Sequence, residues 1–174
     1  MNLRQSYLSG YFIIFSFILL LTACNSQSNQ ILLKDDELNE QTLLAKKHLE
    51  NIGCDVLSFD QEGWEEFQES RLTNKPNQDF WSVQKVEPNN YLNKKIDTYN
   101  FTIKNHRFDN MFAMGKTKVS VYMLNGEIFG GWSYPISEDN DVMGSVFSLE
   151  GLTAEEVQKD YQKWLLQWDA KYGK

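Results

Sequence analysis

The chain has 174 residues, with 17 lysine and arginine residues against 24 aspartate and glutamate residues, which gives a formal net charge of −7. This acidic balance argues against binding to nucleic acid, because contacts with phosphate groups need a surplus of basic side chains. The sequence contains only two cysteines and therefore offers no disulfide framework.

The first residues have the layout of a secretory signal. Arg4 provides a short basic end, and residues 11–21 are apolar except for Ser16. This run is about half of the ~20 apolar residues that a permanent membrane-spanning helix needs. A polar stretch, residues 25–30, follows it directly. We expect the segment to direct export and then to be removed.

The segment Leu21-Thr22-Ala23-Cys24 resembles the lipobox of bacterial lipoprotein precursors. The resemblance implies a diacylglyceryl group on Cys24 Sγ, cleavage between Ala23 and Cys24, and acylation of the new amino terminus, for example with palmitate. Two or more acyl chains give lasting anchorage to a membrane, whereas one chain gives marginal binding. We expect a lipoprotein of the cell envelope, lipid-anchored on the extracytoplasmic side of the cell membrane. A conventional signal peptide with an incidental cysteine is the alternative.

The predicted division of the chain follows from this cleavage site. Residues 1–23 form the signal peptide, residues 24–34 form the lipid anchor and a flexible tether, and residues 35–174 form one extracytoplasmic domain of ordinary size. Cleavage removes one basic and no acidic residue, so the net charge becomes −8. The lipid must then hold the protein on the membrane, because this charge disfavours contact with anionic head groups.

The first clear helical pattern begins at Asp36, which is the expected N-cap, and ends at Gly53, which is the expected left-handed stop. Apolar or small residues recur between them at a spacing of three or four, namely Leu38, Thr42, Ala45, Leu49 and Ile52. Residues 54–59 have the composition of a strand. Residues 63–71 carry Trp64 and Phe67 at helical spacing, and we expect residues 73–93 to be a structured connection with a helical turn.

Three later strands are expected. Residues 95–104 alternate as a half-buried strand does. Residues 116–124 and 127–134 flank Asn125-Gly126, which is the preferred sequence of a two-residue hairpin turn. Regular pairing from this turn puts one apolar row on an inner face, comprising Val119, Val121, Met123, Ile128, Gly130 and Trp132. It puts Tyr122 opposite Phe129 on the outer face, together with Lys118, Ser120 and Ser133.

The end of the chain is expected to form a strand over residues 142–149 and then a long helix. Thr153 and Glu156 have the spacing of a capping box. A continuous apolar stripe follows, comprising Val157, Tyr161, Trp164, Leu165, Trp168 and Tyr172. The sequence therefore predicts an α+β domain, with a mainly antiparallel sheet around the hairpin, packed by an N-terminal and a C-terminal amphipathic helix.

Three segments of the chain resemble the soluble part of small lipoproteins of unknown function from Bacillus-type bacteria. They are YLNKKIDTYNFTIKNH, VYMLNGEIFGGWSYP and YQKWLLQWDAKYG. The resemblance covers about the last two thirds of the chain. It implies an envelope location and a domain boundary. It brings no catalytic residue with it.

Residues 139–150 have part of the spacing of a calcium-binding loop, with Asp139 and Asp141 at its first and third positions and Glu150 at its twelfth. Met143 stands at the fifth position, where it has no oxygen to give, and residues 142–149 alternate as a strand does. We therefore expect a solvated acidic turn without a metal, and keep a calcium-dependent module as an alternative.

A thiol nucleophile is the other chemical alternative, with Cys54 activated by His48 or His106 and oriented by Asp109. No characteristic motif surrounds Cys54, so we expect a buried, unreactive thiol. An envelope enzyme that uses Cys54 or a carboxylate pair remains open, although we expect no enzyme and no cofactor.

The favoured function is a monomeric, non-catalytic binding or interaction module of the envelope. Its partner would be an envelope protein or a cell-wall component, besides the membrane that holds Cys24. Tyr122 and Phe129 are either a pair covered by the first helix, which we favour, or an exposed contact for that partner. The first helix would then take the outer face, because the last helix is expected on the inner one.

Overall fold

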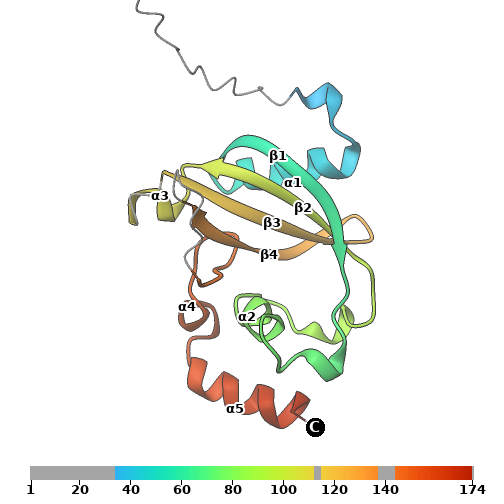
Figure 1. Ribbon diagram of the computed structural model, residues 1–174, viewed down its shortest axis with the longest axis vertical. Coiled ribbons are helices and arrows are strands. Elements are labelled where there is room, and N and C mark those ends of the chain that lie inside the picture. Colours follow the sequence, from blue (N-terminus) through green and yellow to red (C-terminus); the bar gives the residue numbers. More distant parts are fainter. Residues whose placement is uncertain (1–33, 112–114, 137–143, 174) are drawn as a thin grey trace, which may run out of the picture.

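A computed structural model describes residues 34–111, 115–136 and 144–173 of the chain. Its centre is one four-stranded antiparallel sheet in the order β1-β2-β3-β4 (Figure 1). The strands are β1 (Asp55–Glu65), β2 (Ile96–Lys104), β3 (Lys116–Leu124) and β4 (Glu127–Ile136). The predicted α+β fold with a mainly antiparallel sheet is therefore confirmed.

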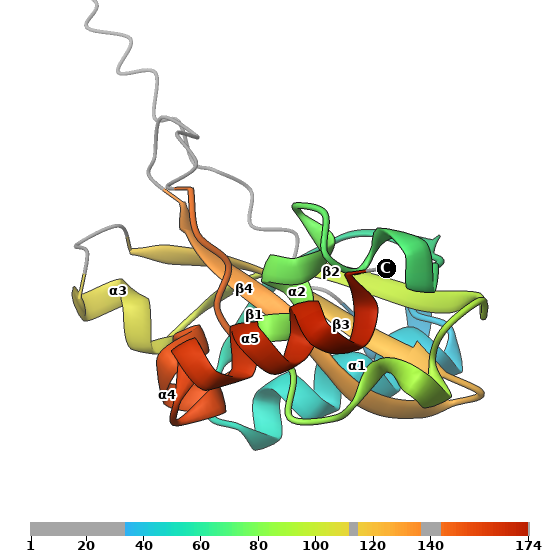
Figure 2. The ribbon, with the colours of Figure 1, turned by 90° about the horizontal axis from the view of Figure 1, so that it is seen from below.

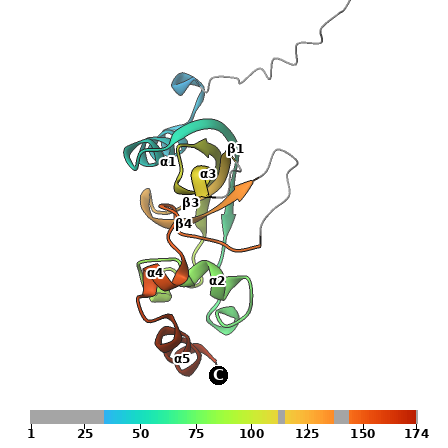
Figure 3. The same cartoon turned by 90° about the vertical axis from the view of Figure 1, so that its left-hand side faces the viewer.

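The helix α1 (Glu40–Asn51) covers one face of the sheet (Figures 1 and 3). Thr42, Ala45 and Leu49 are buried, as the predicted stripe requires. Ala45 and Leu49 pack in one core with side chains of the sheet, including Tyr99, Phe101, Ile103, Val119, Val121 and Met123. This helix was expected on the opposite face, beside Tyr122 and Phe129, and that prediction is wrong.

The two ends of α1 illustrate which local signals decide a helix boundary. Asp36 is not the N-cap, because it lies in a separate 3-10 turn, η1 (Asp35–Glu37). Asn39 caps α1 instead, and its side chain accepts a hydrogen bond from Thr42 N over 2.8 Å. Gly53 follows the helix with a φ of +95°, which confirms the predicted left-handed stop.

The hairpin of β3 and β4 turns at Asn125-Gly126, as predicted, with φ of +52° and +83°. Leu124 pairs with Glu127 and Met123 pairs with Ile128. A β-bulge at Phe129 then shifts the register by one residue, so that Tyr122 lies opposite Gly130. The predicted pairing therefore holds only next to the turn.

This bulge exchanges the two faces for the rest of β4. Val119 lies opposite Ser133, and Trp132 lies opposite Ser120. Ser133 is buried on the α1 side, whereas Trp132 joins Tyr122 on the other side. The predicted placement of Trp132 on the Val119 face and of Ser133 on the Tyr122 face is wrong, because one extra residue inverts the alternation of a strand.

The side chain of Gln84 holds the bulge in place. Its Oε1 accepts a hydrogen bond from Gly131 N over 2.9 Å, and its Nε2 donates to Gly131 O over 2.9 Å and to Phe80 O over 2.7 Å. A Cβ atom added at Gly130 would lie 2.1 Å from Gln84 Oε1. A larger residue at position 130 would therefore displace the amide of Gln84 from this close approach.

The strand β1 extends further than the sequence predicts, and it includes the first part of the expected helical segment 63–71. Gly63, Trp64 and Glu65 pair with residues of β2. Trp64 is 61% exposed, whereas Phe67 is buried beyond the end of the strand. Pairing with β2 decides the conformation of these residues, so the helical spacing of Trp64 and Phe67 was misleading.

The connection from β1 to β2 forms the layer on the other face of the sheet. It contains η2 (Glu69–Arg71), α2 (Asn77–Ser82) and η3 (Pro88–Asn90), which confirms the predicted structured connection with a helical turn. Its side chains build a second core with the sheet and the last helix, comprising Phe67, Leu72, Trp81, Ile96, Tyr122, Trp168 and Tyr172.

The C-terminal segment forms two helices instead of one. The predicted capping box is present, since Thr153 and Glu156 bond to each other's backbone at the start of α4 (Ala154–Gln158). Lys159 then has a φ of +59°, and Asp160 caps α5 (Tyr161–Tyr172) by accepting from Lys163 N. α5 lies beyond α2 as an outer layer, farther from the sheet than α2 (Figures 1 and 3), and it is the layer in front when the molecule is seen from below (Figure 2).

The expected strand over residues 142–149 is wrong in its described part. Phe147 makes one isolated bridge to Ser133, with hydrogen bonds of 2.8 and 3.0 Å, and no strand forms over residues 144–149.

A short helix, α3 (Arg107–Met111), links β2 to the segment before β3. Among the described residues, no helix is long and apolar enough to span a bilayer.

Candidate functional site

Several residues singled out by the sequence lie outside the described part of the chain. Ala23 and Cys24 are among them, so cleavage and lipidation at this position stay predictions. Asp139 and Asp141 of the possible calcium loop are outside it too. Glu150 is described, and its carboxylate already accepts hydrogen bonds from Lys85 Nζ over 2.6 Å and from Ser148 Oγ over 2.9 Å.

These bonds also determine the charge state of Glu150. Burial raises the pKa of its carboxyl group, but the bonds from Lys85 and Ser148 outweigh burial and lower the pKa overall. Within the described residues, no group of three or more histidine, cysteine, aspartate or glutamate side chains could hold a metal ion.

Cys54 is only 6% exposed and lies in the core under α1. Burial, followed by the negative charges of Asp109 and Asp55, raises the pKa of its thiol to about 11. A thiolate is the reactive form of cysteine, so this environment disfavours a nucleophile.

Neither histidine reaches Cys54 with a hydrogen bond. His106 is buried, and its Nε2 lies 3.0 Å from Leu149 O, so this nitrogen carries the proton and donates it to the carbonyl. Burial lowers the pKa of His106. His48 is half-buried on α1. The residues proposed for a catalytic thiol therefore do not assemble into one.

Tyr122 and Phe129 are covered, as the favoured interpretation expects, but by the layer around α2 and not by α1. Tyr122 is 1% exposed, and its ring lies 6.0 Å from Phe67 and 5.9 Å from Phe129. Phe129 is half-buried and stacks on Tyr91 at 3.9 Å. Tyr122 therefore offers no accessible ring to a partner.

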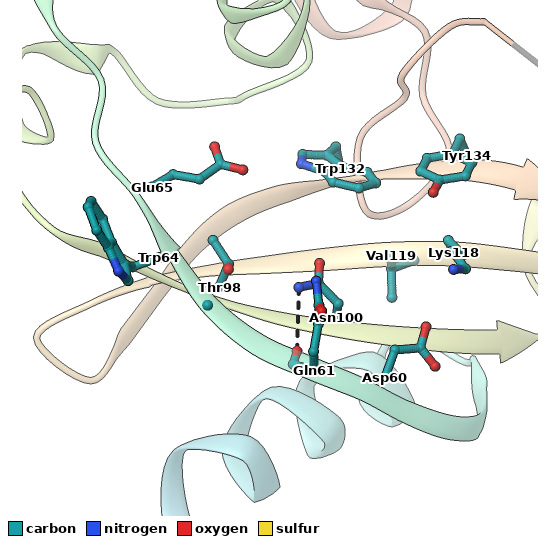
Figure 4. Close-up of a pocket in the computed structure, with 11 residues that line it drawn as sticks. Asp60, Gln61, Trp64, Glu65, Thr98, Asn100, Lys118, Val119, Trp132 and Tyr134 are labelled. Atoms are coloured by element: carbon teal, nitrogen blue, oxygen red, sulfur yellow. Dashed lines mark hydrogen bonds between the residues drawn. The ribbon is translucent and has the colours of Figure 1, made fainter. Parts of the chain in front are cut away.

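A groove of about 440 Å³ lies on the sheet face opposite α1, on the part that the α2 layer leaves open (Figure 4). All four strands contribute to it. Its lining comprises Asp60, Gln61, Gly63, Trp64, Glu65, Thr98, Asn100, Lys118, Val119, Trp132 and Tyr134. We take this polar and aromatic surface, named the sheet groove, as the candidate functional site.

Two aromatic side chains form one wall of the sheet groove. Trp132 and Tyr134 lie two residues apart on β4, and their rings are nearly parallel, with an angle of 14° and a centroid distance of 5.2 Å (Figure 4). Phe80 stacks on Trp132 from the α2 layer at 5.7 Å. Trp64 stands at the rim, where its indole lies on the other side of β1 from Glu65.

A chain of hydrogen bonds supports this wall from the core. Trp132 Nε1 donates to Tyr122 Oη over 2.9 Å, and Tyr122 Oη donates to Glu65 Oε2 over 3.0 Å. Burial raises the pKa of Glu65, although the bond from Tyr122 acts in the opposite direction. These two hydrogen bonds fix the indole of Trp132 and place the half-buried carboxyl group of Glu65 at one end of the sheet groove.

The other end of the sheet groove is formed by Asp60, Lys118 and Tyr134. Asp60 is the extra residue of a bulge in β1, and it accepts hydrogen bonds from Ser58 Oγ over 2.7 Å and Thr102 Oγ1 over 3.0 Å. Burial, followed by the charge of Asp60, raises the pKa of Tyr134. Lys118 makes no ion pair with any residue that the structure describes.

This arrangement can bind a polar ligand. It presents an ammonium group, carboxyl groups, the amide of Asn100 and aromatic rings on a rigid sheet, and one of its few internal bonds is a long contact of 3.4 Å from Asn100 Nδ2 to Gln61 O (Figure 4). The sheet groove is open to solvent and contains no activated nucleophile. Recognition is therefore better supported than catalysis.

The sheet groove was not predicted from the sequence, because its residues form no motif. Lys118 was placed correctly on the outer face of β3, but Trp132 was assigned to the wrong face and Asp60 was not considered. The only usable signal was the alternation of Thr98 and Asn100 as the polar side of β2.

In comparisons with known proteins, the chain matches no family model, no curated protein and no solved structure.

Proposed function

We propose that the protein is a lipoprotein anchored to the extracytoplasmic side of the cell membrane, and that its domain is a non-catalytic binding module of the cell envelope. The sheet groove is its binding surface. The anchoring part of this proposal is supported by the apolar leader and by the segment Leu21-Thr22-Ala23-Cys24.

The binding part is carried by one observation: the sheet groove holds polar groups that the described residues leave available to a ligand. Lys118 has no ion-pair partner among them, and the carboxyl group of Glu65 accepts a hydrogen bond from Tyr122 at only one of its two oxygens, Oε2. Half-buried groups of this kind gain most from a ligand, because part of their hydration is already lost.

The two alternative functions have weaker support. An enzyme would need an activated Cys54 or two cooperating carboxyl groups, but burial raises the pKa of the thiol to about 11. Asp60 and Glu65 lie at opposite ends of the sheet groove (Figure 4). A calcium module would use Glu150, whose carboxylate is already bonded to Lys85 and Ser148.

Lipidation is tested by feeding cells labelled palmitate. The wild-type protein should take up the label, and the Cys24→Ser variant should stay unlabelled and keep its leader, because no other atom can replace the thiol in the modification. Label on the Cys24→Ser variant would show that the lipobox assignment is wrong.

Binding at the sheet groove is tested by photo-crosslinking in intact cells. A photoreactive residue at position 118 should give a crosslinked product, and the same residue at position 47 should give none. Lys47 is a matched control, because it is an exposed lysine on α1, on the other side of the sheet. Equal products from both positions, or none from position 118, would count against the sheet groove as the binding surface.

A further inference from the structure

The chemistry of the sheet groove restricts the class of ligand that it fits. Lys118 and the amide of Asn100 donate hydrogen bonds, whereas Asp60 and Glu65 accept them when ionised. Thr98 and Tyr134 carry hydroxyl groups that do both. A matching ligand must therefore offer donors and acceptors at many positions of its surface, as the hydroxyl groups of a sugar do.

The aromatic wall adds a second requirement. The ring of Tyr134 stacks on the indole of Trp132, which stacks in turn on Phe80, and the hydrogen bond to Tyr122 holds the indole in one orientation. Among the described residues, Tyr134 has no other stacking partner, so its ring is the one that a ligand can contact. Rings of this kind combine an apolar surface with a polar tip. They fit a ligand with C–H groups on one side and hydroxyl groups around its edge, which describes a pyranose ring.

The charges argue against the main competing ligands. The sheet groove contains the carboxyl groups of Asp60 and Glu65 against the single ammonium group of Lys118, and the whole chain has a net charge of −7. This balance repels nucleic acids, phosphate-rich polymers and acidic glycans. A wholly apolar ligand is disfavoured because it would cover these polar groups without bonding to them.

We propose that the sheet groove binds an uncharged saccharide chain, with a sugar ring packed on Tyr134, which Trp132 supports, and with hydroxyl groups bonded to Lys118, Asn100 and Asp60. This inference rests on the proposed function, since it names the ligand class of that same surface. A basic peptide is the competing class, and the ammonium group of Lys118, which makes no ion pair among the described residues, disfavours it.

The test is calorimetric titration of the full chain in a detergent without a sugar head group. The probes are chitotetraose, which is N-acetylated, and cellotetraose, which is not. We expect saturable binding of at least one of them, with a dissociation constant of about 10 μM to 1 mM, as suits a small ligand in an open site.

Three variants locate the binding. Tyr134→Ala and Lys118→Met should each weaken binding by about tenfold or more, which corresponds to the loss of one good contact. Lys47→Met removes the same charge from an exposed position on α1 and should bind like the wild type. Thermal unfolding of each variant checks that the fold is retained, and Lys118→Met keeps the test valid should Tyr134→Ala unfold.

The outcomes separate this inference from the proposed function. Saccharide binding that both variants leave unchanged would overturn it, because the sugar would bind elsewhere. No binding of either probe, together with a polypeptide crosslinked to position 118 in cells, would also overturn it but leave the binding module intact. No saccharide binding and no crosslink at position 118 would overturn both.

Discussion

The bulge in β4 determines which side chains face the sheet groove, and a substitution of Gln84 tests it directly. Gln84 is 4% exposed and bonds to both peptide groups of Gly131. The Gln84→Ala variant lacks the side-chain amide, so the N–H and the C=O of Gly131 lose their hydrogen-bond partner. Each unsatisfied buried group costs about 1–3 kcal/mol. Water entering the vacated space offsets part of this, so we expect a loss of about 2–4 kcal/mol in the free energy of unfolding.

Urea unfolding followed by tryptophan fluorescence measures this loss, with Gln162→Ala as the control. Gln162 is exposed on α5, so its truncation should change the stability by less than about 0.5 kcal/mol. A loss below about 1 kcal/mol for Gln84→Ala would refute the role of Gln84 in holding the bulge.

A double-mutant cycle sharpens the same prediction. A Cβ atom at Gly130 would lie 2.1 Å from Gln84 Oε1, so Gly130→Ala must displace the amide and break the same bonds. Once Gln84 has been truncated, adding Gly130→Ala should cost little more. If the double variant instead loses as much free energy of unfolding as the two single variants together, the two substitutions act independently, contrary to the structure.

Three further predictions concern the rest of the domain. Trp168 is 5% exposed and its Nε1 donates to Leu72 O over 3.1 Å, so Trp168→Ala should lose about 3–5 kcal/mol in urea unfolding; a loss below about 1 kcal/mol would contradict the docking of α5. Cys54 should react slowly with a thiol reagent at neutral pH in the folded protein and fast in urea, because its pKa is about 11; fast labelling of the folded protein would contradict its burial. Because burial lowers the pKa of His106 in the folded state, its contribution to stability should be complete above the unfolded pKa and decline as the pH falls through the folded pKa. His106→Gln should remove this decline from the free energy of unfolding measured at a series of pH values. An unchanged decline in this variant would mean that other titrating groups cause it.

Local signals in the sequence were sufficient for the turn of the hairpin and for the boundaries of some helices, but not for the register of the sheet. The turn at Asn125-Gly126, the stop at Gly53 and the cap at Thr153 depend on neighbouring residues, and all three were predicted correctly. The bulge at Phe129 depends on Gln84, which lies 47 residues from Gly131 in the sequence. No pattern within the hairpin contains that information.

The wrong assignment of the helices to the sheet faces has the same origin. Regular alternation put Trp132 with Val119, so the aromatic last helix was expected there and α1 was expected on the Tyr122 side. The break at Lys159 and the intervening α2 layer then place α5 away from the sheet altogether. A long apolar stripe shows that a helix is buried but does not show what buries it.

The sheet groove follows from how little of the sheet the α2 layer covers. Phe67 and Trp81 pack over the Tyr122 end of β3, so the side chains there belong to the core. Towards Lys118 the same face is open, and the side chains are polar because they meet solvent or a ligand. The bonded chain from Trp132 through Tyr122 to Glu65 lies at the boundary between these two regions. A binding surface built there combines a rigid aromatic wall, supported by the core, with polar groups that remain accessible, which is the combination that selective recognition of a polar ligand requires.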